Sequence, residues 1–160
     1  MFYVPFKLFG GGNVTGIDEV KGEILRRLGE LYGENLVSVV FYGRHLRDPG
    51  FPEIDVMVII ERAYDPVKMN RVADFVENVR DPIEDEYGYH VSFELYTKEE
   101  AENFHSGYLD VVVNYEIAYD RDGYFEWLME EMMNPEKVMR HVQYLSTIEY
   151  FVVDDKENER

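Results

Sequence analysis

The sequence contains no cysteine and few basic residues for its length. Without cysteine the chain forms neither a disulfide nor a thiolate metal site, as is usual for an intracellular protein. Lysine and arginine together number 16 against 33 aspartates and glutamates, which gives a formal net charge of −17. A surface this acidic repels nucleic acid and lacks the basic stripe that binds a phosphate backbone. We therefore do not expect a protein that acts on long nucleic acids.

Long apolar runs are also missing, and no run approaches the roughly 20 residues that a membrane-spanning helix needs. The N-terminus does not have the pattern of a secretory signal. The hydrophobic share of 46% is nevertheless enough for one sizeable core. We expect a cytoplasmic protein without a membrane partner, folded as a single domain over residues 1–160. An aromatic arm at residues 1–14 is compatible with a homodimer.

Apolar periodicity places the main elements of this domain. It predicts helices over residues 17–32, 67–81 and 125–133, a short helix from residue 98, and strands at residues 36–41, 54–60 and 90–95. Residues 82–88 are expected to form an acidic connector, and residues 108–118 fit either a strand or a buried helix. A helix over residues 134–153 and a charged tail at 154–160 end the chain. The predicted fold is α/β (α+β), with a small mixed β-sheet, helices packed on one face and a C-terminal helical extension.

The stretch from residue 41 to residue 60 holds the clearest candidate for chemistry. A strand ends at Gly43, a basic turn with Arg44 and Arg47 follows, and the next strand opens with Glu53 and Asp55. Alternate residues of a strand share a face, so the two carboxylates project together. A hard divalent ion such as Mg²⁺ relieves the repulsion between them. A solvated acidic strand end also fits this pattern, and the arginines could either hold a triphosphate or neutralise neighbouring carboxylates.

These motifs resemble a known family. Gly43-Arg44-His45-Leu46-Arg47, followed by Glu53-Ile54-Asp55-Val56, is similar to the signature of the DNA polymerase β-like nucleotidyltransferase superfamily, particularly its minimal nucleotidyltransferases. In that family an apolar strand ends in Gly-Ser or Gly-Gly, and an Asp-x-Asp pair opens the next strand. The resemblance covers roughly residues 36–133. It implies a nucleotidyltransferase-like fold and metal-dependent transfer of a nucleoside monophosphate from a nucleoside triphosphate to a hydroxyl acceptor, on a protein or a small molecule.

The resemblance also assigns roles to residues. It implies Mg²⁺ or Mn²⁺ held by Glu53, Asp55 and a third carboxylate on a later neighbouring strand, for which Glu94 is the candidate. These three residues would be the catalytic set. The nucleotide would be bound by Gly43, whose backbone can approach phosphate, and by the charges of Arg44 and Arg47.

Two departures from the family pattern support a second hypothesis. Arg44 stands where the family has a small residue, and Glu53 replaces the first aspartate. An Arg44 side chain in the phosphate position would favour a catalytically degenerate protein-binding module, for instance the antitoxin-like partner of a small helical protein. Among the four histidines, only His45 lies within the turn, and none has metal-ligand spacing.

Overall fold

A four-stranded mixed sheet forms the centre of the molecule. The structure is a computed structural model that describes residues 16–103, 105–140 and 143. Its strands are β1 (Leu36–Tyr42), β2 (Glu53–Ile60), β3 (His90–Thr97) and β4 (Tyr115–Asp120), in the spatial order β3-β2-β1-β4. β1 runs antiparallel to β2 and β4, whereas β2 and β3 are parallel. The predicted fold class and the small mixed sheet are confirmed.

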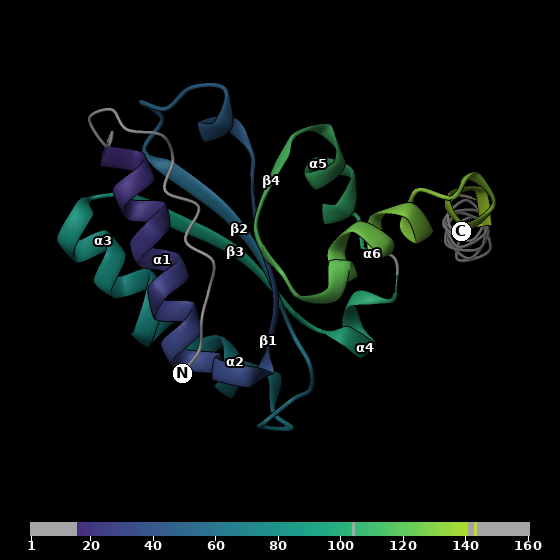
Figure 1. The fold of residues 1–160 in the computed structure, drawn as a ribbon, viewed down its shortest axis with the longest axis horizontal. Coiled ribbons are helices and arrows are strands. Elements are labelled where there is room, and N and C mark those ends of the chain that lie inside the picture. Colours follow the sequence, from purple (N-terminus) through teal and green to yellow (C-terminus); the bar gives the residue numbers. More distant parts are fainter. Residues whose placement is uncertain (1–15, 104, 141–142, 144–160) are drawn as a thin grey trace, which may run out of the picture.

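One face of the sheet is covered by four helical segments. They are α1 (Gly16–Tyr32), α2 (Lys68–Phe75), the π-helical segment η3 (Val76–Arg80) and α3 (Asp81–Tyr87). α1 buries residues at helical spacing, including Val20, Ile24 and Leu28, against alternate residues of β1 and β2. Figure 1 shows α1 and α3 together on this side of the strands. The periodicity of residues 17–32 therefore identified the helix that builds the main core.

Residues 82–88, expected as a connector, are helical as far as Tyr87, and that prediction was wrong. Pro82 is typical of a helix stop, but it lies in the first turn of α3, where proline is tolerated. The π-helical segment η3 joins α2 directly to α3. The helical run ends instead at Gly88, which adopts the left-handed conformation with φ of 73°.

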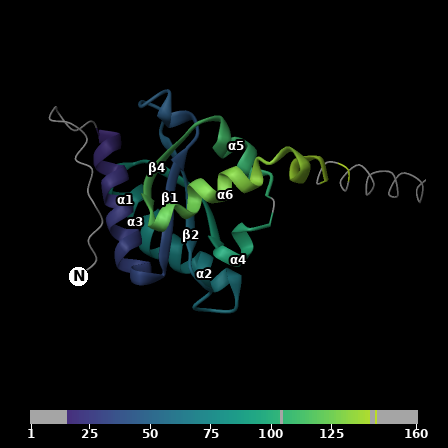
Figure 2. The ribbon, with the colours of Figure 1, turned by 45° about the vertical axis from the view of Figure 1, so that its right-hand side comes forward.

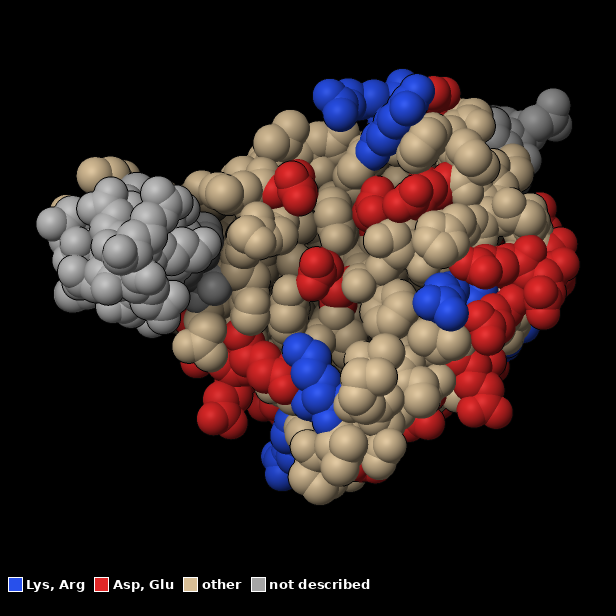
Figure 3. Space-filling view, turned by 180° about the vertical axis from the view of Figure 1, so that it is seen from behind, with Lys and Arg blue, Asp and Glu red and all other residues tan. Residues whose placement is uncertain are grey.

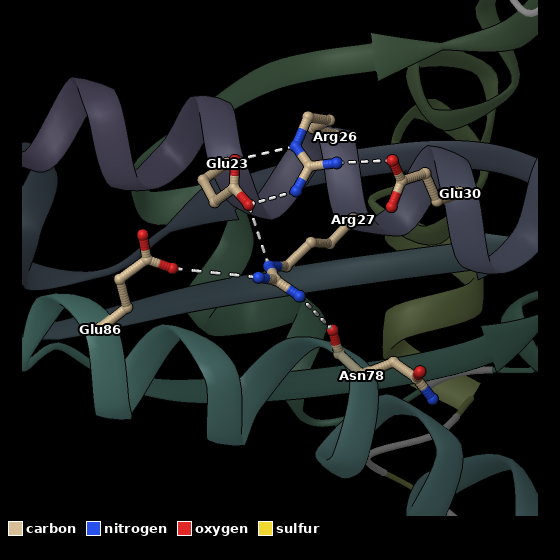
Figure 4. A network of polar contacts seen from close by, with 6 residues as sticks. All are labelled: Glu23, Arg26, Arg27, Glu30, Asn78 and Glu86. Atoms are coloured by element: carbon tan, nitrogen blue, oxygen red, sulfur yellow. Dashed lines mark hydrogen bonds and ion pairs between the residues drawn. The ribbon is translucent and has the colours of Figure 1, made fainter.

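A polar network on the outer side of α1 connects it to its neighbours. The Arg27 side chain pairs with Glu23 on α1, donates to the carbonyl oxygen of Asn78 at 3.4 Å, and lies 3.9 Å from Glu86 of α3. Figure 4 shows this arrangement, with Arg26 between two glutamates of α1. Each exposed pair contributes little stability. Only the contacts of Arg27 with Asn78 and Glu86 link α1 to η3 and α3.

The second face of the sheet is also covered, which corrects the prediction of helices on one face only. α4 (Lys98–Ala101), α5 (Gly107–Val113) and α6 (Tyr124–Met132) pack there against Val40, Met57 and Ile59. Figures 1 and 2 show α5 and α6 on the opposite side of the strands from α1. The reason lies in the strands themselves. Both alternating sets of β2 residues become apolar beyond Asp55, so both faces need a covering layer.

Residues 108–118, which fitted two structures, form both. α5 ends at Val113 and β4 begins at Tyr115, so the helical and strand halves adjoin. Three short segments complete the described chain: η1 (Gly33–Asn35), η2 (Arg44–Leu46) and η4 (Arg121–Gly123). Residues 135–140 are helical; the arm at 1–14, the tail at 154–160 and most of the expected 134–153 helix lie outside the described residues. Within the described part, no helix combines the length and apolar character that crossing a membrane requires.

Candidate functional site

The two motif carboxylates lie on the same face of β2, as predicted. Ile54, Val56 and Val58 enter the core beneath α1, whereas Glu53 and Asp55 face the side covered by α5. Both acidic side chains are partly exposed. Beyond them on the same face, Met57 and Ile59 are fully buried. On this face of β2, the acidic pair is therefore partly exposed to solvent, whereas the residues that follow it are buried in an apolar layer.

Gly43 brings the backbone of the β1 turn directly against Asp55. Its φ of 93° and ψ of −167° belong to a region that is essentially restricted to glycine. A Cβ atom at this position would lie 2.1 Å from Oδ2 of Asp55. The preceding residue, Tyr42, pairs with Asp55 across the antiparallel strands. Only a residue without a side chain allows this contact between turn and carboxylate.

Glu94 shares the face of Asp55 but is displaced from it along the sheet. In the parallel pairing of β2 and β3, Asp55 lies beside Ser92, and Glu94 lies beside Met57. The Tyr96 hydroxyl donates to Oε2 of Glu94 at 2.5 Å. Thus β3 does neighbour β2, as expected, but Glu94 is already engaged with a tyrosine on its own strand.

A further carboxylate, Asp110 of α5, contributes to the electrostatics of this face. Burial raises the pKa of Asp55, and the charges of Glu53 and Asp110 raise it further, while a hydrogen bond from Ser92 and the charge of His90 oppose them. Sequence reasoning missed Asp110, because the structure of residues 108–118 was undecided. Its spacing on a helix would have been the only available signal.

The Tyr42 hydroxyl lies among these acidic groups. Tyr42 is 8% exposed. Burial raises its pKa, and the charges of Glu94, Asp55, Asp110 and Glu53 raise it further. Its hydroxyl has no hydrogen bond to any residue of the described chain. The largely buried Tyr42 side chain thus lies near four carboxylates, and their charges add to the effect of burial on its pKa.

The two predicted arginines lie at the rim of the site. Arg44 and Arg47 are exposed on the β1–β2 loop. The guanidinium of Arg44 stacks over the Phe51 ring, 4.3 Å from its centroid, and lies 3.8 Å from Asp48. Figure 3 shows acidic groups set among uncharged atoms on this side of the molecule, with a Lys and Arg cluster at the top edge. Arg44 therefore turns toward its own loop and does not cover Asp55.

The carboxylate oxygens of Glu53, Asp55 and Glu94 are suitable ligands for a hard divalent ion, but these side chains do not converge on a common position. Across the part of the chain that the structure describes, no three acidic or histidine side chains form a ready metal-binding group. The expected set of Glu53, Asp55 and Glu94 is thus not assembled in this structure. Carboxylate oxygens are nevertheless the ligands that Mg²⁺ and Mn²⁺ prefer. Burial, and after it the charge of Glu53, raises the pKa of Asp55, and a bound cation would favour the ionised carboxylate.

His45 is buried immediately behind the turn. It is 2% exposed, and its ring meets Phe41 edge-on. Neither ring nitrogen has a hydrogen-bond partner among the residues described. Burial and the charge of Lys21 lower the pKa of His45 to about 4, against a smaller opposing effect of Glu116. The imidazole is therefore neutral at pH 7 and supports the turn by packing.

This burial predicts a pH-dependent stability. Because the folded-state pKa of His45 lies below that of a free histidine, protonation favours unfolding. The free energy of unfolding should fall as the pH drops from about 6.5 to 4, by at most about 1.4 kcal/mol per pH unit from this group. His45→Phe should flatten that decline in urea titrations at several pH values. A variant with the wild-type slope would show that His45 is not the group responsible.

No family model and no curated protein matches this sequence. Solved structures do match. A chain of the tri-AMPylated Shewanella oneidensis HEPN toxin in complex with MNT antitoxin is 13% identical, with a TM-score of 0.52, and the match covers 86% of this chain and 95% of that one. A mutant of the toxin-antitoxin MntA-HpeT gives 13% identity and a TM-score of 0.54, with 84% and 95% covered. A chain of a toxin-antitoxin structure with AMP-PNP is 12% identical, with a TM-score of 0.50, and the match covers 83% of this chain and 95% of that one. The chain therefore has the minimal nucleotidyltransferase fold.

Proposed function

We propose that this protein is a metal-dependent nucleotidyltransferase that transfers a nucleoside monophosphate from a nucleoside triphosphate to a protein hydroxyl. The observation that carries the proposal is the contact between the Gly43 turn and the Asp55 carboxylate, on a strand face shared with Glu53. This contact lies where the family resemblance expects the nucleotide. A shared fold alone does not fix function, whereas the geometry of these residues can support one.

Each residue of the site has a chemical role under this proposal. Glu53 and Asp55 would hold Mg²⁺ or Mn²⁺, which when bound would neutralise triphosphate charge and ease deprotonation of the acceptor hydroxyl. Gly43 gives its backbone access to phosphate, since no Cβ atom stands in the way. Arg44 and Arg47 add positive charge at the rim, where a triphosphate tail would lie.

Two observations support a protein as the acceptor. Exposed apolar side chains line α5 and the start of β4 beside the acidic face: Leu109, Val112, Val113 and Tyr115. Contiguous exposed apolar residues of this kind are typical of protein interaction sites. One structure of similar fold contains a tri-AMPylated toxin in complex with its MNT antitoxin, which supports AMP as the transferred group.

The alternative, a degenerate binding module, depended on Arg44 filling the phosphate position. Its guanidinium instead stacks on Phe51 and lies near Asp48, with 63% of the side chain exposed. The carbonyl oxygen of Gly43 accepts hydrogen bonds from the Leu46 N–H group and the Asn114 amide, neither of which involves the Arg44 side chain. The geometry therefore favours the enzyme over the module.

A label-transfer experiment tests the proposal. With ATP labelled at the α-phosphate and Mg²⁺, this protein should raise protein labelling in a cell extract above that of the extract alone, whereas with ATP labelled at the γ-phosphate it should add none. The α-phosphate remains with the transferred nucleotide, and the γ-phosphate leaves in pyrophosphate. The same extract without the protein is the control. Labelling from the γ-phosphate alone, or α-labelling that persists in EDTA, would contradict a metal-dependent nucleotidyltransferase.

A further inference from the structure

His90 opens β3 on the same face of the sheet as the acidic pair of β2. The alternate residues of β3, Val91 and Phe93, pack into the core beneath α1. Because successive residues of a strand point to opposite faces, His90 belongs to the face that α5 covers. In the parallel pairing of the two strands, His90 lies beside Glu53. Neighbouring strands are about 4.8 Å apart, so the histidine is one strand spacing from the first carboxylate of the pair.

A glutamate of α3 holds the imidazole of His90. Nδ1 of His90 lies 2.6 Å from Oε1 of Glu84. Since β3 is the outer strand of the described sheet, a side chain of α3 reaches His90 past this edge. An ionised carboxylate only accepts hydrogen bonds, so Nδ1 carries the hydrogen atom, and Nε2 of the neutral ring is free to accept a proton. Within the described chain Nε2 has no hydrogen-bond partner, and 58% of the side chain is exposed to solvent.

The order of these groups across the sheet matches the two ends of a nucleotidyl transfer. Under the proposed function, the triphosphate tail lies toward Gly43 and the arginines of the β1–β2 loop. β1 and β3 flank β2 on opposite sides, so the turn and His90 stand on opposite sides of the acidic pair. The attacking and leaving oxygens of such a reaction lie roughly in line, with the phosphorus atom between them. When pyrophosphate leaves toward the Gly43 turn, the acceptor hydroxyl therefore approaches from the side of His90.

We propose that His90 is the general base of the transfer and that Glu84 is the residue that positions it. Nε2 of His90 takes the proton of the acceptor hydroxyl while the hydroxyl oxygen forms a bond to the α-phosphorus of the nucleotide. The bond from that phosphorus to the oxygen of the β-phosphate breaks, and pyrophosphate leaves with the electron pair. The exposed imidazolium then returns its proton to solvent. The inference rests on the proposed function and names the residue that activates the acceptor.

Three measurements on His90→Gln separate this role from nucleotide binding and from folding. The rate of label transfer from α-labelled ATP to protein in the cell extract, at saturating ATP and Mg²⁺, should fall about 100-fold or more. The calorimetric affinity for ATP in Mg²⁺ should stay within about threefold of wild type, because a base that serves the acceptor does not hold the nucleotide. The melting temperature should be close to that of wild type, because an exposed pair contributes little stability.

Glu84→Gln tests the positioning role. It keeps the size of the side chain but removes the charge that orients the ring, so transfer should slow about tenfold or more at unchanged ATP affinity. In the double variant with His90→Gln, the rate should be no lower than in His90→Gln alone, because Glu84 acts only through the histidine. Glu86→Gln, at an exposed glutamate of the same helix that pairs with Arg27, is the matched control and should transfer label as wild type does.

The outcomes distinguish this inference from the proposed function. A His90→Gln variant that transfers label at the wild-type rate, or one that loses transfer only because it no longer binds ATP, overturns the role of His90 and leaves the nucleotidyltransferase proposal standing. Further slowing by Glu84→Gln in the absence of His90 overturns the positioning role of Glu84. A wild-type protein that transfers no label overturns the proposed function and the general base together.

Discussion

Replacing Asp55 with asparagine should reduce metal-dependent nucleotide transfer by about 100-fold or more, without unfolding the protein. A carboxylate that holds the ion accounts for several kcal/mol of transition-state stabilisation, and each 1.4 kcal/mol corresponds to about a tenfold change in rate. Asparagine has nearly the same shape and can still accept the hydrogen bond from Ser92. The assay is transfer of label from ATP labelled at the α-phosphate.

The stability of Asp55→Asn provides an internal check. Burial and the charge of Glu53 raise the folded-state pKa of Asp55 above its usual value. The ionised form is therefore disfavoured in the folded protein at pH 7, and removing its charge should leave the metal-free melting temperature unchanged or higher. Glu86→Gln, at an exposed pair with Arg27 on the other side of the sheet, should change neither activity nor stability appreciably. Full activity in Asp55→Asn would refute the assigned role.

Replacing Gly43 with alanine should lower the free energy of unfolding more than any other substitution proposed for this protein. It should also abolish nucleotide binding. The new Cβ atom would lie 2.1 Å from Oδ2 of Asp55, so the carboxylate or the turn must move. The backbone conformation, with φ of 93° and ψ of −167°, adds about 1–3 kcal/mol of strain for any residue other than glycine. Urea unfolding measures the first effect, and titration with ATP and Mg²⁺ measures the second.

Gly50→Ala is the matched control, because Gly50 lies in the same loop. Its φ is not in the left-handed region, and a Cβ atom there would meet only Oδ1 of Asp48, at an ordinary distance of 3.5 Å. The control should lose little stability and retain nucleotide binding. Equal behaviour of the two alanine variants would show that the Gly43 contact with Asp55 has no special importance.

The sequence was sufficient to locate the turn and the acidic pair because both depend on short-range rules. Period-two alternation in a strand fixes the common direction of Glu53 and Asp55. A glycine that ends an apolar strand indicates a special backbone conformation, which Gly43 adopts. The helix over residues 17–32 followed equally directly from its periodicity.

The remaining features depend on long-range packing, which single-sequence patterns do not reveal. Pro82 looked like a helix stop, but η3 delivers it into a first helical turn, where it is tolerated. The second helical layer follows from apolar residues on both faces of β2. The effect of the Asp110 charge on the pKa of Asp55 could not be predicted while residues 108–118 fitted either a strand or a helix.

The most direct test of the account is calorimetric titration of ATP into the wild-type protein, first with Mg²⁺ and then with EDTA, alongside Asp55→Asn. We predict saturable ATP binding in Mg²⁺ that is lost in EDTA and in the Asp55→Asn variant. Loss of ATP binding in EDTA and in the variant would both indicate a metal-dependent nucleotide site where Asp55 lies against the Gly43 turn. Absence of binding by the folded wild-type protein in Mg²⁺, or equal binding by Asp55→Asn, would contradict a nucleotide site at this turn.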